Sequence, residues 1–336
     1  MKKRYANICF LLAVVCAAQP TGLRTLKAQN AAGTVPDTIY AKTTYTYKVA
    51  GQHEINADVY RKPGDEILPA ILWIHGGALI FGTRIWIPVD QLEAYLKAGF
   101  AVVAIDYRLA PETKLPEIIE DLKDAYAWLR AEGPGLCGID PERIAVVGHS
   151  AGGYLTLMSG FCLDPRPDAL VAFYGYGNIT GPWYSQPDPF YNRSPAVSKE
   201  QAFQAVGDTV IFRTPSATPA RERGKFYLYC RQQGLWPQQV GGHDPADLDW
   251  YAAFEPLRNL TPSYPPTVLL HGEKDTDVPF EQSERMAEEL KRHGVAFEFI
   301  RHPAWGHGFD HVGLDDTGVQ EAFDRVLAFL REHVRP

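Results

Sequence analysis

Cysteine is scarce in this chain, and two of its five cysteines, Cys9 and Cys16, lie within the first 30 residues. The other three are Cys137, Cys162 and Cys230, an odd number that allows at most one disulfide among them. Buried, unpaired thiols are an equally good interpretation of these three residues. No Cys-x-x-Cys or His-Glu-x-x-His spacing occurs, so the sequence predicts no metal centre.

The chain also lacks an excess of basic residues. It has 33 Lys and Arg against 40 Asp and Glu, which gives a net charge of −7. The basic residues are scattered along the chain, so nucleic acid is not an expected partner. A hydrophobic content of 46% and a charged content of 22% are those of an ordinary globular protein. The length of 336 residues allows one large domain or two smaller ones.

No apolar run beyond the N-terminal region is long enough to cross a bilayer. The N-terminus itself has a basic start at residues 2–4, followed by an apolar run over residues 8–18. This order is typical of an export signal, which we place at residues 1–28. We therefore expect a periplasmic or secreted protein. Lipid attachment at Cys16 is the less favoured alternative, because the preceding valine is bulkier than the small residue typical of such sites.

Short apolar segments alternate with amphipathic segments along most of the chain. Buried strands are expected at residues 70–75, 101–106, 143–147, 170–174, 267–271 and 296–301. The longer helices are expected at residues 115–132, 280–293 and 319–330. Two segments of alternating polarity, 43–49 and 55–61, flank Gly51-Gln52 and predict a hairpin. Buried strands that alternate with helices predict an α/β fold, in which helices cover both faces of a mostly parallel sheet.

Residues 176–264 interrupt this alternation. The segment is rich in proline and aromatic residues and contains only short helical pieces. A structureless loop of this length is uncommon inside a compact domain. We therefore interpret it as a cap, inserted between two core strands of a domain that spans residues 40–336. Trp183 and Trp236 are candidate substrate contacts that could stack on sugar or aromatic rings, or they form the cap's own core.

The segment Gly148-His149-Ser150-Ala151-Gly152 follows an apolar strand and precedes a predicted helix. A serine at a sharp turn between strand and helix is typical of an activated nucleophile, because the strained turn exposes the hydroxyl. Glycines on both sides keep side chains out of the crowded turn. Ser150 is therefore the candidate nucleophile.

A second glycine-rich segment, His75-Gly76-Gly77-Ala78, directly follows a predicted strand. Acyl transfer places negative charge on a carbonyl oxygen, and paired backbone N–H groups can stabilise it. The candidate donors to this oxyanion are the N–H groups of Gly76 or Gly77 and of Ala151, the residue after the candidate nucleophile. His75 is a candidate substrate contact beside this loop.

An acid and a base are expected later in the chain. Asp275 and Asp277 both lie in the turn after the strand at 267–271, and either can orient a histidine. His307 lies between two glycines in the loop after the strand at 296–301 and is the favoured base. It is preferred to four other histidines, which are His243, His293, His302 and His311. Trp305 is a candidate substrate contact in the same loop.

Taken together, these motifs resemble the α/β-hydrolase esterases, near the hormone-sensitive-lipase-like and bacterial acetyl- or feruloyl-esterase branch. The resemblance covers about residues 50–333 apart from most of the cap. It rests on four segments, which are residues 75–77, 106–112, 148–153 and 306–309. The chain order Ser150, Asp275, His307 is the one expected of that fold. The resemblance also favours Asp275 as the acid, because a following x-x-Val-Pro usually accompanies that acid in similar enzymes.

The resemblance implies ester hydrolysis, with acetyl or feruloyl esters of carbohydrates among the candidate substrates, and a cap that covers the site favours short-chain acyl groups. The reaction would use a Ser-Asp-His triad and an acyl-enzyme, with no metal or organic cofactor. Ala78 stands where that branch usually has a third glycine, and His149 where it often has an acidic residue. Both differences favour the acetyl-esterase and aryl-formamidase side. Amide cleavage by a formamidase or peptidase, and a catalytically inactive binding protein, are the alternatives. The natural substrate and the oligomeric state stay open.

Overall fold

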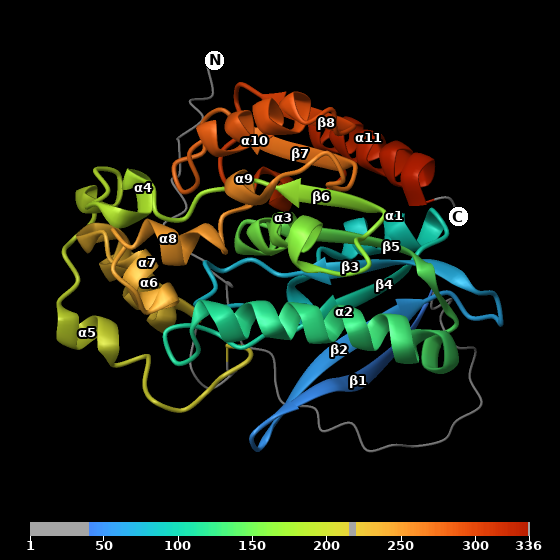
Figure 1. Ribbon diagram of the computed structural model, residues 1–336, viewed down its shortest axis with the longest axis horizontal. Helices are drawn as coiled ribbons and strands as arrows, with labels where there is room; N and C mark the ends of the chain where they lie inside the picture. Colours follow the sequence, from blue (N-terminus) through green and yellow to red (C-terminus); the bar gives the residue numbers. More distant parts are fainter. Residues whose placement is uncertain (1–39, 215–219, 335–336) are drawn as a thin grey trace, which may run out of the picture. The chain divides into compact units, whose positions relative to one another are not determined.

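The structure is a computed structural model that describes residues 40–214 and 220–334 (Figure 1). The expected export signal at residues 1–28 lies outside the described residues. Within the described ranges, no helix is long and apolar enough to span a membrane.

An eight-stranded sheet forms the centre of the described residues, in the order β1-β2-β4-β3-β5-β6-β7-β8. The strands are β1 (Ala41–Ala50), β2 (His53–Arg61), β3 (Leu68–Ile74), β4 (Ala101–Ile105), β5 (Ile139–His149), β6 (Ala169–Phe173), β7 (Thr267–Gly272) and β8 (Phe297–His302). β1 and β2 form the expected antiparallel hairpin, and β2 also pairs antiparallel with β4. All the other pairs are parallel. The predicted α/β class with a mostly parallel sheet is therefore confirmed.

Helices cover both faces of this sheet (Figure 1). The main ones are α1 (Val89–Lys97), α2 (Leu115–Cys137), α3 (Ala151–Cys162), α10 (Glu281–Arg292) and α11 (Thr317–Val334). α2 continues five residues beyond the end that the sequence predicted. Its stop signal is Gly138, which adopts a left-handed conformation with φ 61°, a common helix terminus. The apolar stripe of α2, including Ile118, Leu122 and Leu129, is buried.

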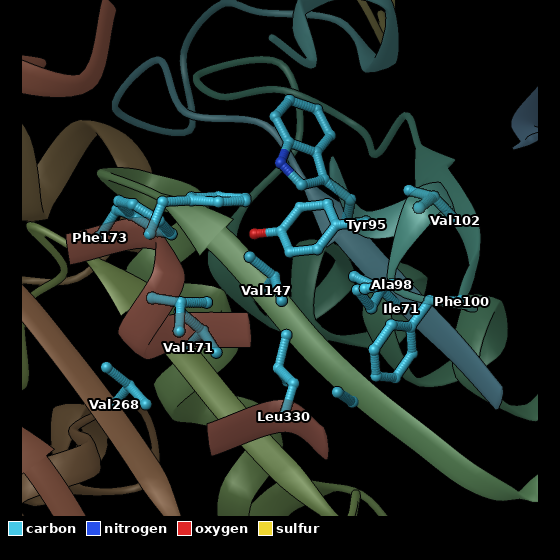
Figure 2. Packing of buried hydrophobic residues seen from close by; sticks show 14 of the residues in the cluster. Ile71, Tyr95, Ala98, Phe100, Val102, Val147, Val171, Phe173, Val268 and Leu330 are labelled. Carbon is cyan, nitrogen blue, oxygen red and sulfur yellow. The ribbon is translucent and has the colours of Figure 1, made fainter. Parts of the chain in front are cut away.

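One face of the sheet carries a continuous apolar core (Figure 2). Val147, Val171 and Val268 lie directly opposite one another on neighbouring strands, so their side chains share a face. Tyr95 of α1 and Leu330 of α11 belong to the same buried cluster. Burial of one such aliphatic side chain contributes about 1.5–3 kcal/mol. The cluster therefore fixes the strands whose ends carry the candidate catalytic residues.

The segment interpreted above as a cap lies between β6 and β7. Its helices are α4 (Pro182–Ser185), α5 (Lys199–Phe203), α6 (Ala220–Gln233), α7 (Trp236–Gly241), α8 (Leu248–Ala252) and α9 (Pro256–Asn259). Helices α4 to α8 gather at the end of the sheet to which β6 points, on the left in Figure 1. The loops that carry the candidate catalytic residues leave the parallel strands at this same end.

A buried ion pair fastens the cap to the core. The Arg223 guanidinium of α6 donates to both carboxylate oxygens of Glu112, each at 2.8 Å. It also donates to the carbonyls of Ile80 and Ala110, each at 2.6 Å. Both side chains of the ion pair are 2% exposed. Because a buried charge without a partner is costly, this pair holds α6 against the loops that follow β3 and β4.

Candidate active site

Ser150 occupies the sharp turn between β5 and α3. Its backbone has φ 56° and ψ −116°, a strained conformation for a residue with a side chain. The Ser150 N–H donates to the Phe173 carbonyl at 2.9 Å, which ties the turn to β6. A Cβ on Gly152 would collide with the Ile74 carbonyl. The glycine therefore allows α3 to begin close to β3, and the serine side chain stays half-buried at the turn.

His307 lies between Ser150 and Asp275. Its Nε2 is 3.0 Å from Ser150 Oγ, and its Nδ1 is 2.7 Å from Asp275 Oδ2. The Asp275 side chain is fully buried. Its Oδ1 accepts the backbone N–H groups of Asp277 at 2.8 Å and Val278 at 2.9 Å. The carboxylate is thus fixed by its own turn, and it orients the imidazole so that Nε2 can exchange a proton with Ser150 Oγ.

A second histidine contacts the same carboxylate. His271 Nε2 lies 3.2 Å from Asp275 Oδ2 and 3.1 Å from the Val278 carbonyl. Its Nδ1 is 2.7 Å from Ser283 Oγ. An Nε2–H tautomer fits these contacts, with the serine hydroxyl donating to Nδ1. The sequence interpretation gave His271 no role in the site. Its spacing of four residues from Asp275, across the turn that ends β7, is the signal that could have revealed it.

The carboxylates change the proton affinity of this site. Burial lowers the pKa of His307, but the charges of Asp275 and Asp277 outweigh burial and raise that pKa to about 9. Burial by itself raises the pKa of Asp275. The opposite effect of His307 and His271 is larger, so the pKa falls well below its ordinary value. Asp275 therefore stays ionised, and a protonated His307 is stabilised.

The glycine-rich loop after β3 lies against the turn that carries the serine. A Cβ on Gly76 would be 3.3 Å from Ser150 Cβ and 2.8 Å from the His149 carbonyl. Ala151 is the first residue of α3, a position whose N–H has no acceptor within its own helix. Ala78, where the resembled branch usually has glycine, has φ 55°. The left-handed conformation that glycine favours is thus kept here by a residue with a side chain.

Two of the four expected substrate contacts are not available to a substrate in this structure, because His75 and Trp236 are fully buried. His75 stacks on Tyr107 with ring centres 4.2 Å apart, and the Tyr107 hydroxyl donates to the His75 carbonyl at 3.0 Å. Trp236 Nε1–H donates to the Ala78 carbonyl at 3.0 Å. Both rings therefore support the loop of Gly76 and Gly77. Burial could not be read from aromatic composition alone.

The other two expected contacts keep part of their surface exposed. Trp183 is half-buried and stacks on Tyr184 with ring centres 3.6 Å apart. Trp305 is also half-buried and stacks on Phe309 with ring centres 4.0 Å apart. Trp183 thus belongs to the aromatic packing of the cap, and Trp305 to the edge of the sheet core. Both stay candidates for substrate contact.

A buried polar cluster that the sequence did not indicate lies behind His307. Asp310 accepts hydrogen bonds from the Tyr174 hydroxyl and from Gln91 Nε2, each at 2.7 Å. His149 Nε2 lies 3.1 Å from the same carboxylate. The Tyr174 ring centre is 4.6 Å from that of His307. His149, which precedes Ser150 where the resembled branch often has an acidic residue, thus faces an aspartate of the 3-10 helix Phe309–Val312.

The structure also shows whether the described cysteines are paired and whether metal-ligating side chains gather. Cys137, Cys162 and Cys230 are free thiols. Burial raises the pKa of Cys162 to about 12, so its thiol stays protonated near neutral pH. Among the residues that the structure describes, no group of three or more His, Cys, Asp and Glu side chains could hold a metal ion.

Solved structures share this fold. A protein of unknown function from Staphylococcus aureus superposes with a TM-score of 0.71 and 23% identity, over 87% of this chain and 99% of that chain. An acetyl ester-xyloside bifunctional hydrolase from Caldicellulosiruptor lactoaceticus gives a TM-score of 0.62 and 21% identity, over 88% of this chain and 98% of that chain. Esterases are thus among the proteins of similar structure.

Sequence comparison gives the family. A non-reducing polyketide synthase from Emericella nidulans is 30% identical in an alignment that covers 89% of this chain. The chain spans only 14% of the length of that synthase. The sequence model of a family described as alpha/beta hydrolase fold matches residues 71–311, a range that includes Ser150, Asp275 and His307. The chain therefore belongs to the alpha/beta hydrolase fold family.

Proposed function

We propose that the protein is a serine esterase that hydrolyses short-chain acyl esters through an acyl-enzyme. The observation that carries this proposal is the continuous row from Asp275 through His307 to Ser150, with separations of 2.7 and 3.0 Å. A nucleophile within hydrogen-bond reach of a base, which is itself oriented by a third group, is the arrangement needed for covalent catalysis.

In the first step, His307 Nε2 takes the Ser150 proton while Oγ attacks the acyl carbon. Asp275 keeps the proton on Nδ1 and stabilises the imidazolium that forms. The N–H groups of Gly76 or Gly77 and of Ala151 donate to the oxyanion. One such donor typically accounts for about 2.7–4 kcal/mol of transition-state stabilisation. The tetrahedral intermediate then collapses, and the leaving alcohol takes the proton from Nε2.

In the second step, water repeats the cycle on the acyl-enzyme. His307 Nε2 removes a proton from the water as its oxygen attacks the acyl carbon, and returns that proton to Ser150 Oγ as the acid leaves. The cycle consumes one water and one ester and forms one acid and one alcohol. It uses only groups of this chain.

The cap favours short acyl groups. Tyr184 and Trp236 stack with ring centres 4.1 Å apart, and both are fully buried. Trp236 also donates a hydrogen bond to the carbonyl of Ala78, the residue that follows Gly76 and Gly77 in their loop. A long acyl chain would have to displace these packed rings, which costs more than the added contacts return. We therefore propose acetyl to butyryl esters as substrates, carbohydrate esters among them, acted on by an exported enzyme.

The proposal is tested with para-nitrophenyl esters from acetate to octanoate, together with acetylated xylan, methyl ferulate and an acetanilide as the amide. We expect turnover to be highest from acetate to butyrate and at least about 10³-fold lower in S150A. If S150A keeps more than about a tenth of wild-type turnover, Ser150 is not the nucleophile. Faster cleavage of the amide than of the matched ester would favour an amidase.

A further inference from the structure

We propose that Asp277 determines substrate specificity by accepting a hydrogen bond from a hydroxyl group on the alcohol part of the ester, close to the scissile bond. The substrate class is then a partially acylated polyol or sugar. The inference rests on the proposed esterase function and deepens it. It follows from how the two oxygens of this carboxylate are used.

Oδ1 of Asp277 is saturated by groups of the cap. It accepts hydrogen bonds from the Tyr191 hydroxyl at 2.7 Å, from Arg231 Nη1 at 2.7 Å and from the Tyr227 hydroxyl. Three donors on one oxygen leave no room for a substrate group there. They also fix the plane of the carboxylate and therefore the direction in which its other oxygen points.

Oδ2 of Asp277 is turned toward the catalytic base. It lies 3.5 Å from His307 Nε2, the nitrogen that also faces Ser150 Oγ. It accepts no hydrogen bond from any residue within the described ranges. The side chain keeps 22% of its surface exposed. An ionised oxygen has about two lone pairs to satisfy, so Oδ2 is an open acceptor beside the reacting atoms.

The charges around Asp277 do not balance. Arg231 is 1% exposed and is paired with both Asp188 and Asp277. Its guanidinium also lies over the Tyr191 ring, 4.4 Å from the ring centre. Among these three groups one positive charge thus serves two carboxylates, which leaves one negative charge in excess when His307 is in its neutral, attacking form. A hydrogen-bond donor on the ligand complements that excess, whereas an anionic group is repelled.

The position of Oδ2 assigns the donor to the alcohol part of the substrate. His307 Nε2 must reach the ester oxygen of the leaving alcohol in order to protonate it. A substrate group that lies within hydrogen-bond reach of both His307 Nε2 and Asp277 Oδ2 is therefore part of the leaving alcohol. A hydroxyl on the carbon next to the one that bears the ester is within this reach. Neighbouring hydroxyls of this kind are what a sugar or polyol presents.

Two acetate esters isolate the hydroxyl donor. 2-Hydroxyethyl acetate and 2-methoxyethyl acetate have similar leaving groups, but only the first can donate a hydrogen bond. A hydrogen bond to a charged acceptor stabilises a complex more than one to a neutral acceptor, so we expect kcat/KM to favour the hydroxyl ester by about tenfold or more. In D277N, where an amide replaces the open oxygen, we expect the ratio to fall to within about threefold of unity.

D188N is the matched control, since it also removes one carboxylate from Arg231 but leaves Asp277 in place. We expect D188N to keep the wild-type ratio, with thermal unfolding and circular dichroism of each variant as the check on folding. Acetylcholine, a cation without a donor, separates attraction of charge from hydrogen bonding. If it is preferred to the hydroxyl ester, the site binds cations and the inference is overturned.

The wild-type comparison keeps the inference open to refutation even if D277N does not fold. Equal kcat/KM for the two acetate esters in the wild type, or an unchanged ratio in D277N, would overturn the role of Asp277 alone. Failure of the wild type to hydrolyse either ester would instead overturn the proposed function, and the inference with it. Turnover of 2-methoxyethyl acetate that is lost in S150A supports the proposed function independently of the ratio.

Discussion

His271 Nε2 lies 3.2 Å from Asp275 Oδ2, and His307 Nδ1 lies 2.7 Å from the same oxygen. The acid of the candidate triad thus has an imidazole on each side. His307 is half-buried, while His271 is fully buried beneath the turn.

His271 is expected to support catalysis through Asp275. We predict that H271A lowers kcat roughly tenfold, because Asp275 loses one of the groups that hold its pKa low and its position fixed. The loss should be greatest at acidic pH, where a carboxyl group with a raised pKa protonates first. H271Q, whose amide can still donate, should recover part of the activity. A uniform loss at all pH values, without rescue by H271Q, would indicate only disturbed packing.

The two aspartates of the turn are expected to differ strongly in their effect on rate. We predict that D275N lowers kcat on para-nitrophenyl acetate by about 10³-fold or more, because the asparagine amide can hold His307 in the wrong tautomer. D277N should lower it far less, since Asp277 Oδ1 is directed at the cap. Steady-state kinetics of both variants with one ester decide between them. The opposite ranking would assign the triad acid to Asp277.

The activity is expected to rise with pH above neutrality. Nucleophilic attack requires neutral His307, and the carboxylates raise the pKa of that histidine to about 9. Below this pKa the neutral fraction, and therefore kcat/KM, should increase about tenfold per pH unit and then level off. D277N should shift the midpoint downward, because a carboxylate that favours the protonated form is removed. A wild-type midpoint below 6.5 would contradict this assignment.

The two cap tryptophans should respond differently to substitution. We expect W183A to change the preference among acyl chain lengths while leaving turnover of the acetate within about threefold of the wild type. W236A should lower turnover of the acetate as well, because the hydrogen bond to Ala78 and the support of the oxyanion loop are lost. A chain-length series of para-nitrophenyl esters measures both effects. Equal profiles for the two variants would show that the cap acts only as a unit.

The buried ion pair between the cap and the core should matter for stability. We predict that R223M destabilises the protein by about 3–5 kcal/mol, because Glu112 stays buried without its partner. The double variant R223M/E112Q should regain part of this loss, since no unpaired charge remains. Urea unfolding followed by tryptophan fluorescence measures both. A double variant no more stable than R223M would mean that the unpaired charge is not the main cost and that the lost hydrogen bonds to Ile80 and Ala110, absent from both variants, dominate.

The sequence predicted the parts of the molecule that depend on local pattern. The hairpin, the parallel strands and the serine turn all follow from periodicity and glycine spacing within a few residues. The choice between Asp275 and Asp277 depends on the direction of two carboxylates in one turn, which spacing does not encode. The donors to Asp277 come from residues 46 to 86 positions earlier in the chain. Such contacts arise only when the cap folds back over the sheet.

The Arg223–Glu112 pair also bears on how caps can be exchanged among hydrolases of this architecture. The Glu112 side chain belongs to the core and is 2% exposed, so a transplanted cap without a guanidinium at the matching place would leave this buried carboxylate without its ion-pair partner. A chimera of this chain should therefore carry α6 along with the graft or neutralise position 112. In this chain the cap and position 112 of the core therefore form one electrostatic unit, and a change of charge at one requires a compensating change at the other.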